Sequence, residues 1–336
     1  MSTFSKPAVL DGIRATGLSL ALCAIMAFVP LESMVSILVA PLVPIPIAFV
    51  ISKHGIGLGA VVGTVIVLVA MLLAVVAAGS GQVLFGVSAG LIIILLIGPV
   101  GMGAGISLRR GVSQLRLFLL LTGIFFMSLS IWLGALVAAS GFGPQAGAQT
   151  VAEYMIESSR PFYLALGMSE QDIDSRKTEV LDMAAMAPYM APAVVLVASA
   201  ALSGVSVGLA RKLFAKMRQP FPQDFVLRDF RLHFSFAYMM ILGLLCELVA
   251  PFLPEAYSSP ASLAGANLLI VAEVLFFIQG VAIASFFLWR YKVSKPKRAG
   301  IYAVLVLLQL TLSLVSWIGL FDTWIDYRRR FAKQRA

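Results

Sequence analysis

Residues 262–289 read SLAGANLLIVAEVLFFIQGVAIASFFLW. This run is longer than the ~20 apolar residues that an α-helix needs to cross the hydrocarbon core of a bilayer. It also contains Asn267, Glu273 and Gln279. A carboxyl group at the centre of a bilayer costs about 2.5–3.5 kcal/mol on insertion scales. We therefore expect Glu273 to have a hydrogen-bond partner, a proton or a water-filled cavity beside it.

The composition of the whole chain is that of a membrane protein. Hydrophobic residues make up 60% and charged residues 12%, whereas soluble domains carry about 25% charged residues. The formal net charge of +9 comes from Lys and Arg in short gaps between apolar runs. That arrangement is typical of cytoplasmic loops that face anionic lipids. We therefore expect the lipid bilayer, and no nucleic acid, as a partner.

The apolar runs predict an all-α, polytopic transmembrane helical bundle of about nine spans. The uncharged region Gly55–Leu108 would be about 80 Å long as one helix, so it is divided into two spans at Gly79–Gln82. The second span, Met34–Ile51, contains three prolines, which predict a broken or re-entrant segment. The other spans are Ala15–Leu31, Leu117–Ala139, Pro192–Ala210, Phe234–Pro251, Gly265–Trp289 and Ile301–Phe321.

The spans divide the chain into two parts. Residues 1–211 form a six-span membrane core with an outer acidic helical loop at about 141–190. Residues 212–336 form a cytoplasmic interfacial loop and three further spans with a basic C-terminal tail. In the acidic loop, Ser169 and Asp172 predict a helix N-cap, and a surface helix pair is favoured over a lid above a cavity. Residues 211–233 alternate phenylalanines with charges, which indicates an amphipathic interfacial segment, with a partner-docking site as the alternative.

The distribution of basic residues predicts a cytoplasmic N-terminus in a bacterial inner membrane. The basic loops after the second, fourth, sixth and eighth spans then all lie on the cytoplasmic side, as the positive-inside rule requires. With nine full crossings, the basic residues 328–335 fall on the opposite side, against that rule. Either this tail is an exception or one span is not a full crossing.

Small residues recur at four-residue spacing in the third and fourth spans. They are Gly55, Gly59 and Gly63, then Gly86 and Gly90, then Gly101 and Gly105. Such spacing lets helix backbones approach closely. Close packing is the favoured interpretation, and a helix pair that slides or hosts a ligand is the alternative.

Five polar residues deep in the C-terminal spans are the candidate substrate-binding residues: Glu273, Glu247, Gln279, Gln309 and Asn267. Counting from the cytoplasmic ends places Glu247 and Glu273 at depths that agree within a few Å. Two close carboxyls in a low dielectric do not both ionise, and proton-coupled carriers use such pairs. The same counting lets Gln279 and Gln309 bond across helices. The six-residue spacing of Asn267, Glu273 and Gln279 turns them in three directions, so they cannot all line one pocket.

The sequence has no signature of catalysis or metal binding. His54 and His233, the two histidines, both lie at cytoplasmic flanks, so no histidine cluster is available for a metal. The chain contains no HExxH or Walker A motif, and no nucleophile and base are recognisable together. We therefore expect no enzyme activity and no cofactor. At the end of the last span, Asp326 and Arg330 have the spacing of an i,i+4 ion pair.

The C-terminal third resembles a known family. Asn267, Phe277–Gly280, Gly319–Asp322 and Asp326–Arg328 resemble the YybS-like family of bacterial inner-membrane proteins, which has no established function. The similarity is best over Gln219–Arg330. That family is distantly similar to the substrate-capture (S) components of energy-coupling factor transporters, six-helix proteins that bind vitamins or other small molecules.

This resemblance implies an S-component-like six-helix core with three C-terminal helices appended, and a membrane protein partner for coupling. S components often carry an AxxxA pattern in the first helix, where this chain has Ala15, Ser19 and Cys23. The resemblance transfers no binding residue. Two functional hypotheses follow: a small-molecule or ion carrier or substrate-capture subunit, and a membrane scaffold or assembly factor without transport activity.

Overall fold

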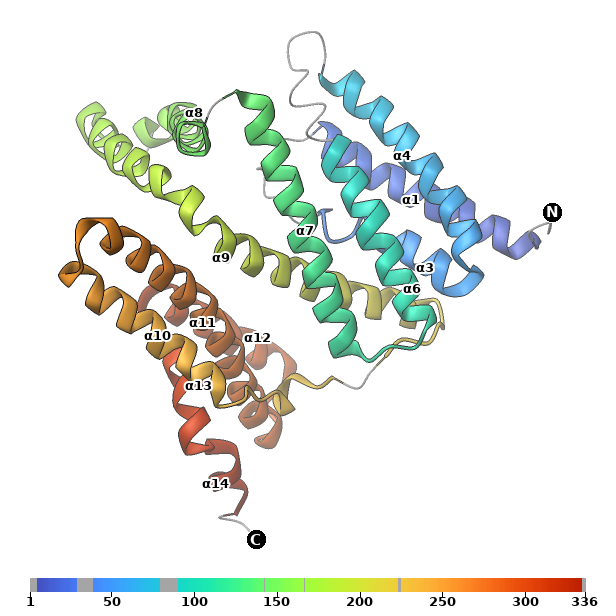
Figure 1. Cartoon of the computed structure of the whole chain (residues 1–336). Coiled ribbons are helices and arrows are strands. Elements are labelled where there is room, and N and C mark those ends of the chain that lie inside the picture. Colours follow the sequence, from blue (N-terminus) through green and yellow to red (C-terminus); the bar gives the residue numbers. More distant parts are fainter. Residues whose placement is uncertain are drawn as a thin grey trace. The chain divides into compact units, whose positions relative to one another are not determined.

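A computed structural model describes residues 5–28, 39–78, 90–141, 143–165, 167–222 and 225–333. Every regular element in these ranges is a helix (Figure 1). The chain packs as two compact units. Unit 1 comprises Met1–Pro188 and Ala198–Asp224, and unit 2 comprises Tyr189–Val197 and Phe225–Ala336. The predicted all-α class is therefore confirmed.

Unit 1 is built around a short helix. Its elements are α1 (Lys6–Phe28), α3 (Ile45–His54), α4 (Ile56–Ala78), the π-helical turn Leu96–Gly101, α6 (Met102–Arg109), α7 (Gln114–Ser140), α8 (Pro144–Ala165) and most of α9 (Glu170–Lys216). The helix α3 packs against α1, α4 and α6. Its residues 45–51 are all buried, so this short helix forms the centre of the apolar core.

The glycine pattern is explained by the side chains of α3. A Cβ added at Gly105 would lie 2.6 Å from Ile51 Cβ, and one added at Gly101 would lie 2.7 Å from Ile47 Cγ2. A Cβ at Gly59 would overlap the Ile51 side chain from the other side. The glycines of α4 and of the α6 region therefore make room for two isoleucines. This agrees with the prediction that the small residues serve close packing of the helices. Gly86 lies outside the described residues.

Unit 2 is organised around α11. Its elements are the 3-10 turn Leu227–Asp229, α10 (Ser235–Val249), the 3-10 turn Ala250–Phe252, α11 (Glu255–Arg290), α12 (Lys295–Leu312), α13 (Leu314–Ile325) and α14 (Tyr327–Lys333). Both α10 and α13 pack extensively on α11, and the buried Ala272 and Phe276 form the centre of its small core (Figure 1).

Seven of the described helices are long and apolar enough to cross a membrane, and there are eight if α12 and α13 count as one bent span. The sequence predicts nine, and the difference falls at two places. In the described part of the predicted second span the helix is the ten-residue α3, which by itself is too short to cross ~30 Å of hydrocarbon. Its last residues, Lys53 and His54, pair with Asp11 of α1, so the chain has returned to the N-terminal end of α1 by residue 54. Residues 34–38 of that span, like the predicted turn Gly79–Gln82, lie outside the described residues. The predicted ninth span breaks between α12 and α13, whose axes differ by 96°.

The bent pair returns toward the end of α11 from which it starts. α12 begins at Lys295, just after α11 ends at Arg290. α14 follows α13, and the Phe331 carbonyl in α14 accepts a hydrogen bond from Arg290 Nη2 at 3.0 Å. Ser313, at the break, lies instead beside Glu273, about 25 Å back along α11. Residues 295 and 331 thus lie at the same end of α11.

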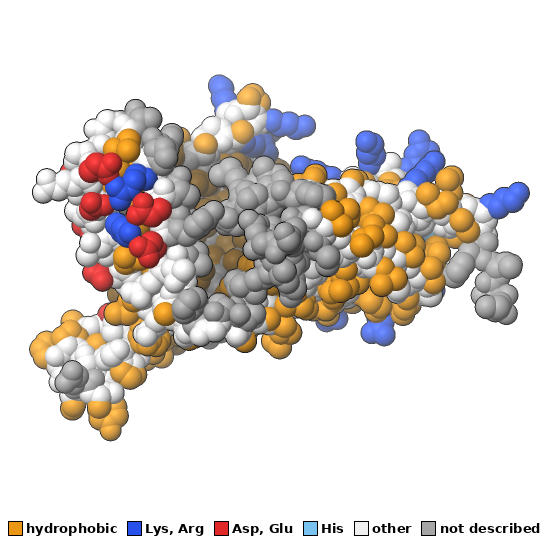
Figure 2. All heavy atoms as spheres, turned by 90° about the horizontal axis from the view of Figure 1, so that it is seen from above, with side chains coloured by type: hydrophobic (Ala, Val, Ile, Leu, Met, Phe, Trp, Pro, Cys, Tyr) orange, Lys and Arg blue, Asp and Glu red, His pale blue; other side chains and the backbone are white. Residues whose placement is uncertain are grey.

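The acidic loop of unit 1 forms a helix pair. The predicted N-cap of α9 is confirmed as a reciprocal capping box, in which the Ser169 hydroxyl and the Asp172 carboxylate each accept a backbone N–H. Arg160 of α8 bonds to Glu170 and Asp174 of α9 as well as to Glu157 in its own helix. Figure 2 shows these acidic and basic side chains gathered at the surface. This charged cluster joins α8 to the start of α9.

The charged cluster should make the helix pair sensitive to acid. Hydrogen bonds from Lys177 and Arg160 hold the pKa of Glu157 below its ordinary value of 4.5. The stabilisation is therefore fully present above pH 4.5 and is lost as the pH falls through the lower pKa of the folded protein. Hydrogen exchange of α8 amides, corrected for the intrinsic pH dependence, should show protection falling in that range. A Glu157→Gln variant should lose protection at neutral pH. Equal protection in the variant and the wild type at neutral pH would contradict this role.

Candidate functional site

The break between α12 and α13 brings several polar groups to Glu273. Its Oε1 atom accepts hydrogen bonds from Gln309 Nε2, at 3.0 Å, and from the Ser313 hydroxyl. Gln309 Oε1 in turn accepts the backbone N–H of Ser316 at 3.0 Å, and the Ser316 hydroxyl donates to the Glu273 carbonyl at 2.8 Å. Ser313 itself has φ +51°, a left-handed backbone conformation. A half-buried carboxyl group thus lies where a helix is interrupted.

The chemistry of this break follows from how helices end. The last carbonyls of α12 have no helical donors, and the first N–H groups of α13 have no helical acceptors. Gln309 satisfies one of those N–H groups, that of Ser316. The break therefore places carboxylate, hydroxyl and amide oxygens close together. These are the ligands that small hard cations prefer.

A second polar group holds a non-helical segment against α11. The segment 225–234 precedes α10, and its Leu232 N–H donates to Gln279 Oε1 at 2.7 Å. The carbonyls of Arg228 and Phe230 accept from Arg328 Nη1 at 3.1 and 2.7 Å. Backbone that is not helical needs such partners wherever water is excluded. Gln279 and Arg328 supply them.

Arg328 is balanced by Asp322. Arg328 Nη2 and Asp322 Oδ2 are 2.8 Å apart, and each side chain is only 3% exposed. Gln279 Nε2 also donates to Asp322 Oδ2 at 3.4 Å, and the Tyr327 N–H donates to Oδ1 at 2.9 Å. A buried charge pair costs least when its remaining hydrogen-bonding groups are satisfied; here Arg328 Nη1 and Nη2 are bonded, whereas the buried Nε has no partner among the described residues. The pair therefore forms one connected polar group with the segment 225–234.

Asn267 contacts the part of α9 that belongs to unit 2. Its Oδ1 accepts the Ala193 N–H at 3.1 Å, and its Nδ2 donates to the Tyr189 carbonyl at 2.8 Å. A regular α-helix joins those two backbone groups to each other. Pro188 and Pro192 flank this turn, and a proline removes a backbone donor. The Asn267 amide thus anchors a proline-interrupted turn of α9 to α11.

The predicted pair of close carboxyls does not form. Glu247 accepts from the Ser262 hydroxyl at 3.0 Å and lies beside Gly265. The distance along α11 from Gly265 to Glu273 is about 12 Å. The depth predicted for Glu247 was wrong because the segment 225–234 already runs along α11 as far as Gln279 before α10 begins. α10 is therefore shifted along α11 toward the end that carries Glu255.

Two further predicted pairings are replaced by others. Gln279 and Gln309 do not bond to each other, since Gln309 bonds to Glu273 and Gln279 to Asp322. Asp326 pairs with Arg231 Nη1 at 2.8 Å rather than with Arg330. The reason is the left-handed conformation of Asp326, φ +45°, which interrupts the helix that an i,i+4 pair requires.

The site includes residues that sequence reasoning missed. Asp322 and Arg328 are six residues apart, which in one continuous helix would turn them to different faces. Only the interruption at Asp326 brings them together. Ser313 and Ser316 could not be predicted as site residues, because single hydroxyl groups are common inside apolar spans.

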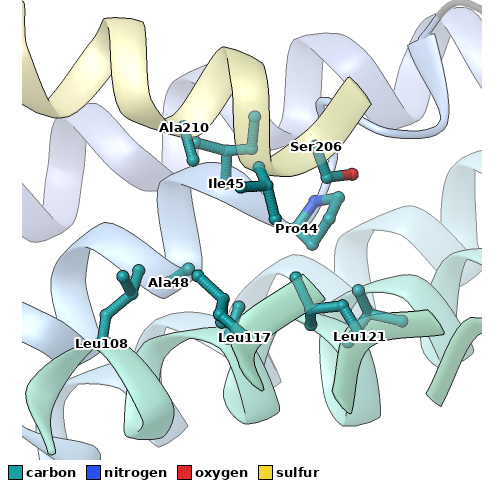
Figure 3. Close-up of a pocket in the computed structure, with 11 residues that line it drawn as sticks. Pro44, Ile45, Ala48, Leu108, Leu117, Leu121, Ser206 and Ala210 are labelled. Atoms are coloured by element: carbon teal, nitrogen blue, oxygen red, sulfur yellow. The ribbon is translucent and has the colours of Figure 1, made fainter. Parts of the chain in front are cut away.

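An apolar cavity lies in unit 1, between α3, α6, α7 and α9 (Figure 3). Its volume is about 20 Å³, close to the minimum of roughly 10–15 Å³ for one water molecule. Ser206 is the polar side chain in its wall, and its hydroxyl already donates to the Pro41 carbonyl at 2.9 Å. Because water needs two or more polar partners, the cavity is a dry packing gap. None of the five candidate residues lines it.

Within the described ranges, no three His, Cys, Asp or Glu side chains are grouped as metal ligands. The long apolar helices and their internal polar links define a polytopic helical membrane protein. The chain belongs to the family described as "Predicted membrane protein (DUF2232)", whose model matches residues 17–323. No curated protein and no solved structure matches the chain.

Proposed function

We propose that the protein is a carrier for a small monovalent cation, alone or coupled to a second solute, and that Glu273 is its cation-binding group. The observation that carries this proposal is the helix break at Ser313, which places Glu273 among oxygen ligands. Interrupted helices with carboxylates and free helix-end carbonyls are the way in which many secondary transporters hold their coupling ions.

The charge of the site favours a monovalent ion. Within the described part of unit 2, Glu273 is the carboxyl group at the break, and the Asp322 charge is already balanced by Arg328. One carboxylate and one monovalent cation are neutral together, which lowers the cost of holding either in hydrocarbon. The oxygen ligands suit a proton or Na⁺.

The hydrogen bonds suggest how binding would act on the helices. Gln309 of α12 and Ser313 at the break both donate to Glu273 Oε1. A cation on this oxygen would compete with both donors and release the break from α11. Because Ser316 bonds to both Gln309 and the Glu273 backbone, the start of α13 would move with them. The proposed activity involves no covalent catalysis.

A flux assay tests the proposal. Wild-type protein, Glu273→Gln and the control Glu247→Gln would be reconstituted into liposomes, and proton and Na⁺ movement would be followed after each gradient is imposed. Glu273→Gln keeps the size of the side chain and one acceptor oxygen for Gln309 and Ser313 but removes the charge, so we expect flux to fall about tenfold or more. Glu247→Gln should keep most of it. Wild-type flux no faster than that of empty liposomes, or full flux in Glu273→Gln, would contradict the proposal.

A second candidate is a membrane scaffold or assembly factor. The observation in its favour is the segment 225–234, which Gln279 and Arg328 hold in a fixed conformation. A rigid non-helical segment is a suitable docking element for a membrane protein partner. In that case a protein that co-purifies would be lost on neutralising Arg231, and Glu273→Gln would be silent in the flux assay.

The distribution of Lys and Arg also suggests in which membrane, and in which orientation, the protein lies. We propose a bacterial inner membrane with the N-terminus and the basic loops in the cytoplasm, because Lys and Arg concentrate in those loops. Anionic lipids would contact the basic loops, and no nucleic acid partner is proposed.

A further inference from the structure

We propose that the basic end of unit 2 is a binding surface for anionic phospholipid headgroups, completed by the return of α13 and α14 to that end. This inference is independent of the proposed cation site at Glu273. It begins from the distribution of charge. No Lys or Arg occurs between residues 232 and 289, while residues 290–298 contain five and no acidic residue. The positive charge of α11 and its neighbours is therefore confined to one end.

The return of the chain adds further cations to the same end. The bond from Arg290 to the Phe331 carbonyl fixes α14 beside the end of α11. α14 also carries Arg329 and Arg330, both exposed. This return also answers the conflict with the positive-inside rule, because a segment that enters and returns leaves its two basic ends on one side of the membrane.

Many of these cations have no internal counter-charge. Asp322 forms an ion pair with Arg328, and Asp326 forms one with Arg231. Among the described residues, Lys292, Lys295, Arg329 and Arg330 make no ion pair, and all four are exposed. Clusters of four or more Lys and Arg next to a membrane span attract anionic lipids with about 1 kcal/mol per charge.

Aromatic side chains place this end at the depth of the headgroups. Trp289 is 50% exposed, Tyr291 62% and Phe331 44%. Trp and Tyr at the end of a span typically lie at the membrane–water interface. The guanidinium of Arg228 lies 4.1 Å from the centre of the Trp289 ring, so a cation is held at the same level. Lipid phosphates lie at this depth, which favours a lipid over an acidic soluble protein.

Quenching of tryptophan fluorescence by brominated lipids tests this surface. Three of the four tryptophans, Trp289, Trp317 and Trp324, lie in unit 2, and a Trp132→Phe background removes the fourth. The full-length protein would be placed in phosphatidylcholine vesicles containing a fixed fraction of brominated phosphatidylglycerol or of brominated phosphatidylcholine. We expect stronger quenching by the anionic lipid, giving an apparent preference of at least about twofold that falls as salt is added.

Two variants separate this surface from general attraction to basic loops. The triple variant Lys292→Gln, Arg329→Gln, Arg330→Gln should remove most of the preference, and it leaves the buried Arg328 untouched. The matched control Arg109→Gln, Arg110→Gln, Arg116→Gln removes the same charge from unit 1 and should keep the preference. Two results with the Trp132→Phe protein alone would overturn the proposal, even if a charge variant failed to fold. One is equal quenching by the two lipids, and the other is a preference for the anionic lipid that does not change with salt. Loss of the preference in the control alone would also overturn it.

Discussion

Gly319→Ala is expected to force α13 away from α11 and to lower the free energy of unfolding by about 3 kcal/mol, the upper part of the range for overpacking. An added Cβ would overlap the Phe276 carbonyl oxygen and lie 2.9 Å from the Gly280 nitrogen. Both obstacles are backbone atoms of α11, so no side chain can rotate to relieve the contact. Thermal unfolding in detergent should show an apparent Tm lowered by roughly 10 °C.

Two further substitutions make this prediction specific. Gly280→Ala should behave similarly, because its added Cβ would overlap the Val315 carbonyl oxygen. Gly300→Ala in α12 is the matched control, since nothing lies within 4 Å of its added Cβ. Alanine is favoured over glycine inside a helix, so the control should be unchanged or slightly more stable. An unchanged Tm for Gly319→Ala would mean that α11 and α13 do not pack as closely as described.

Arg328→Ala is expected to cost about 3–5 kcal/mol, because it leaves Asp322 as a buried charge without its partner. It also leaves the Arg228 and Phe230 carbonyls without their donor. The segment 225–234 should then lose its fixed conformation. Hydrogen exchange should show faster exchange at the Leu232 amide, and the apparent Tm should fall.

A comparison of single and double variants isolates the charge pair. Asp322→Leu with Arg328→Met should lose less stability than Arg328→Ala alone, since an apolar pair leaves no isolated buried charge. The exposed pair of Arg231 and Asp326 is the control, and Arg231→Gln should cost at most about 1 kcal/mol. If Arg328→Ala were as mild as Arg231→Gln, Arg328 would be in contact with water and the polar group described here would not exist.

Much of the fold could be predicted from the sequence because lipid imposes simple rules. Seven of the nine predicted spans correspond to long apolar helices. The capping box at Ser169 and the close-packed glycines also followed from local patterns. These features depend on composition and short-range spacing, which a single sequence contains.

The features that failed depend on where helices are interrupted. Ser313 and Asp326 adopt left-handed backbone conformations that no local pattern signals, since neither is glycine. The first interruption converts the predicted ninth span into a bent pair, and the second brings Arg328 to Asp322. The depth of Glu247 was wrong for a related reason, because non-helical backbone beside α11 shifts the start of α10.

The central claim is that Glu273 binds a cation at the break between α12 and α13. Infrared difference spectroscopy on reconstituted protein tests it most directly, by recording carboxyl and carboxylate bands while the buffer alternates in pH and in Na⁺ against choline. We predict a band that responds to one of these changes in the wild type and in Glu247→Gln but is absent in Glu273→Gln. Identical difference spectra for the wild type and Glu273→Gln would contradict the claim.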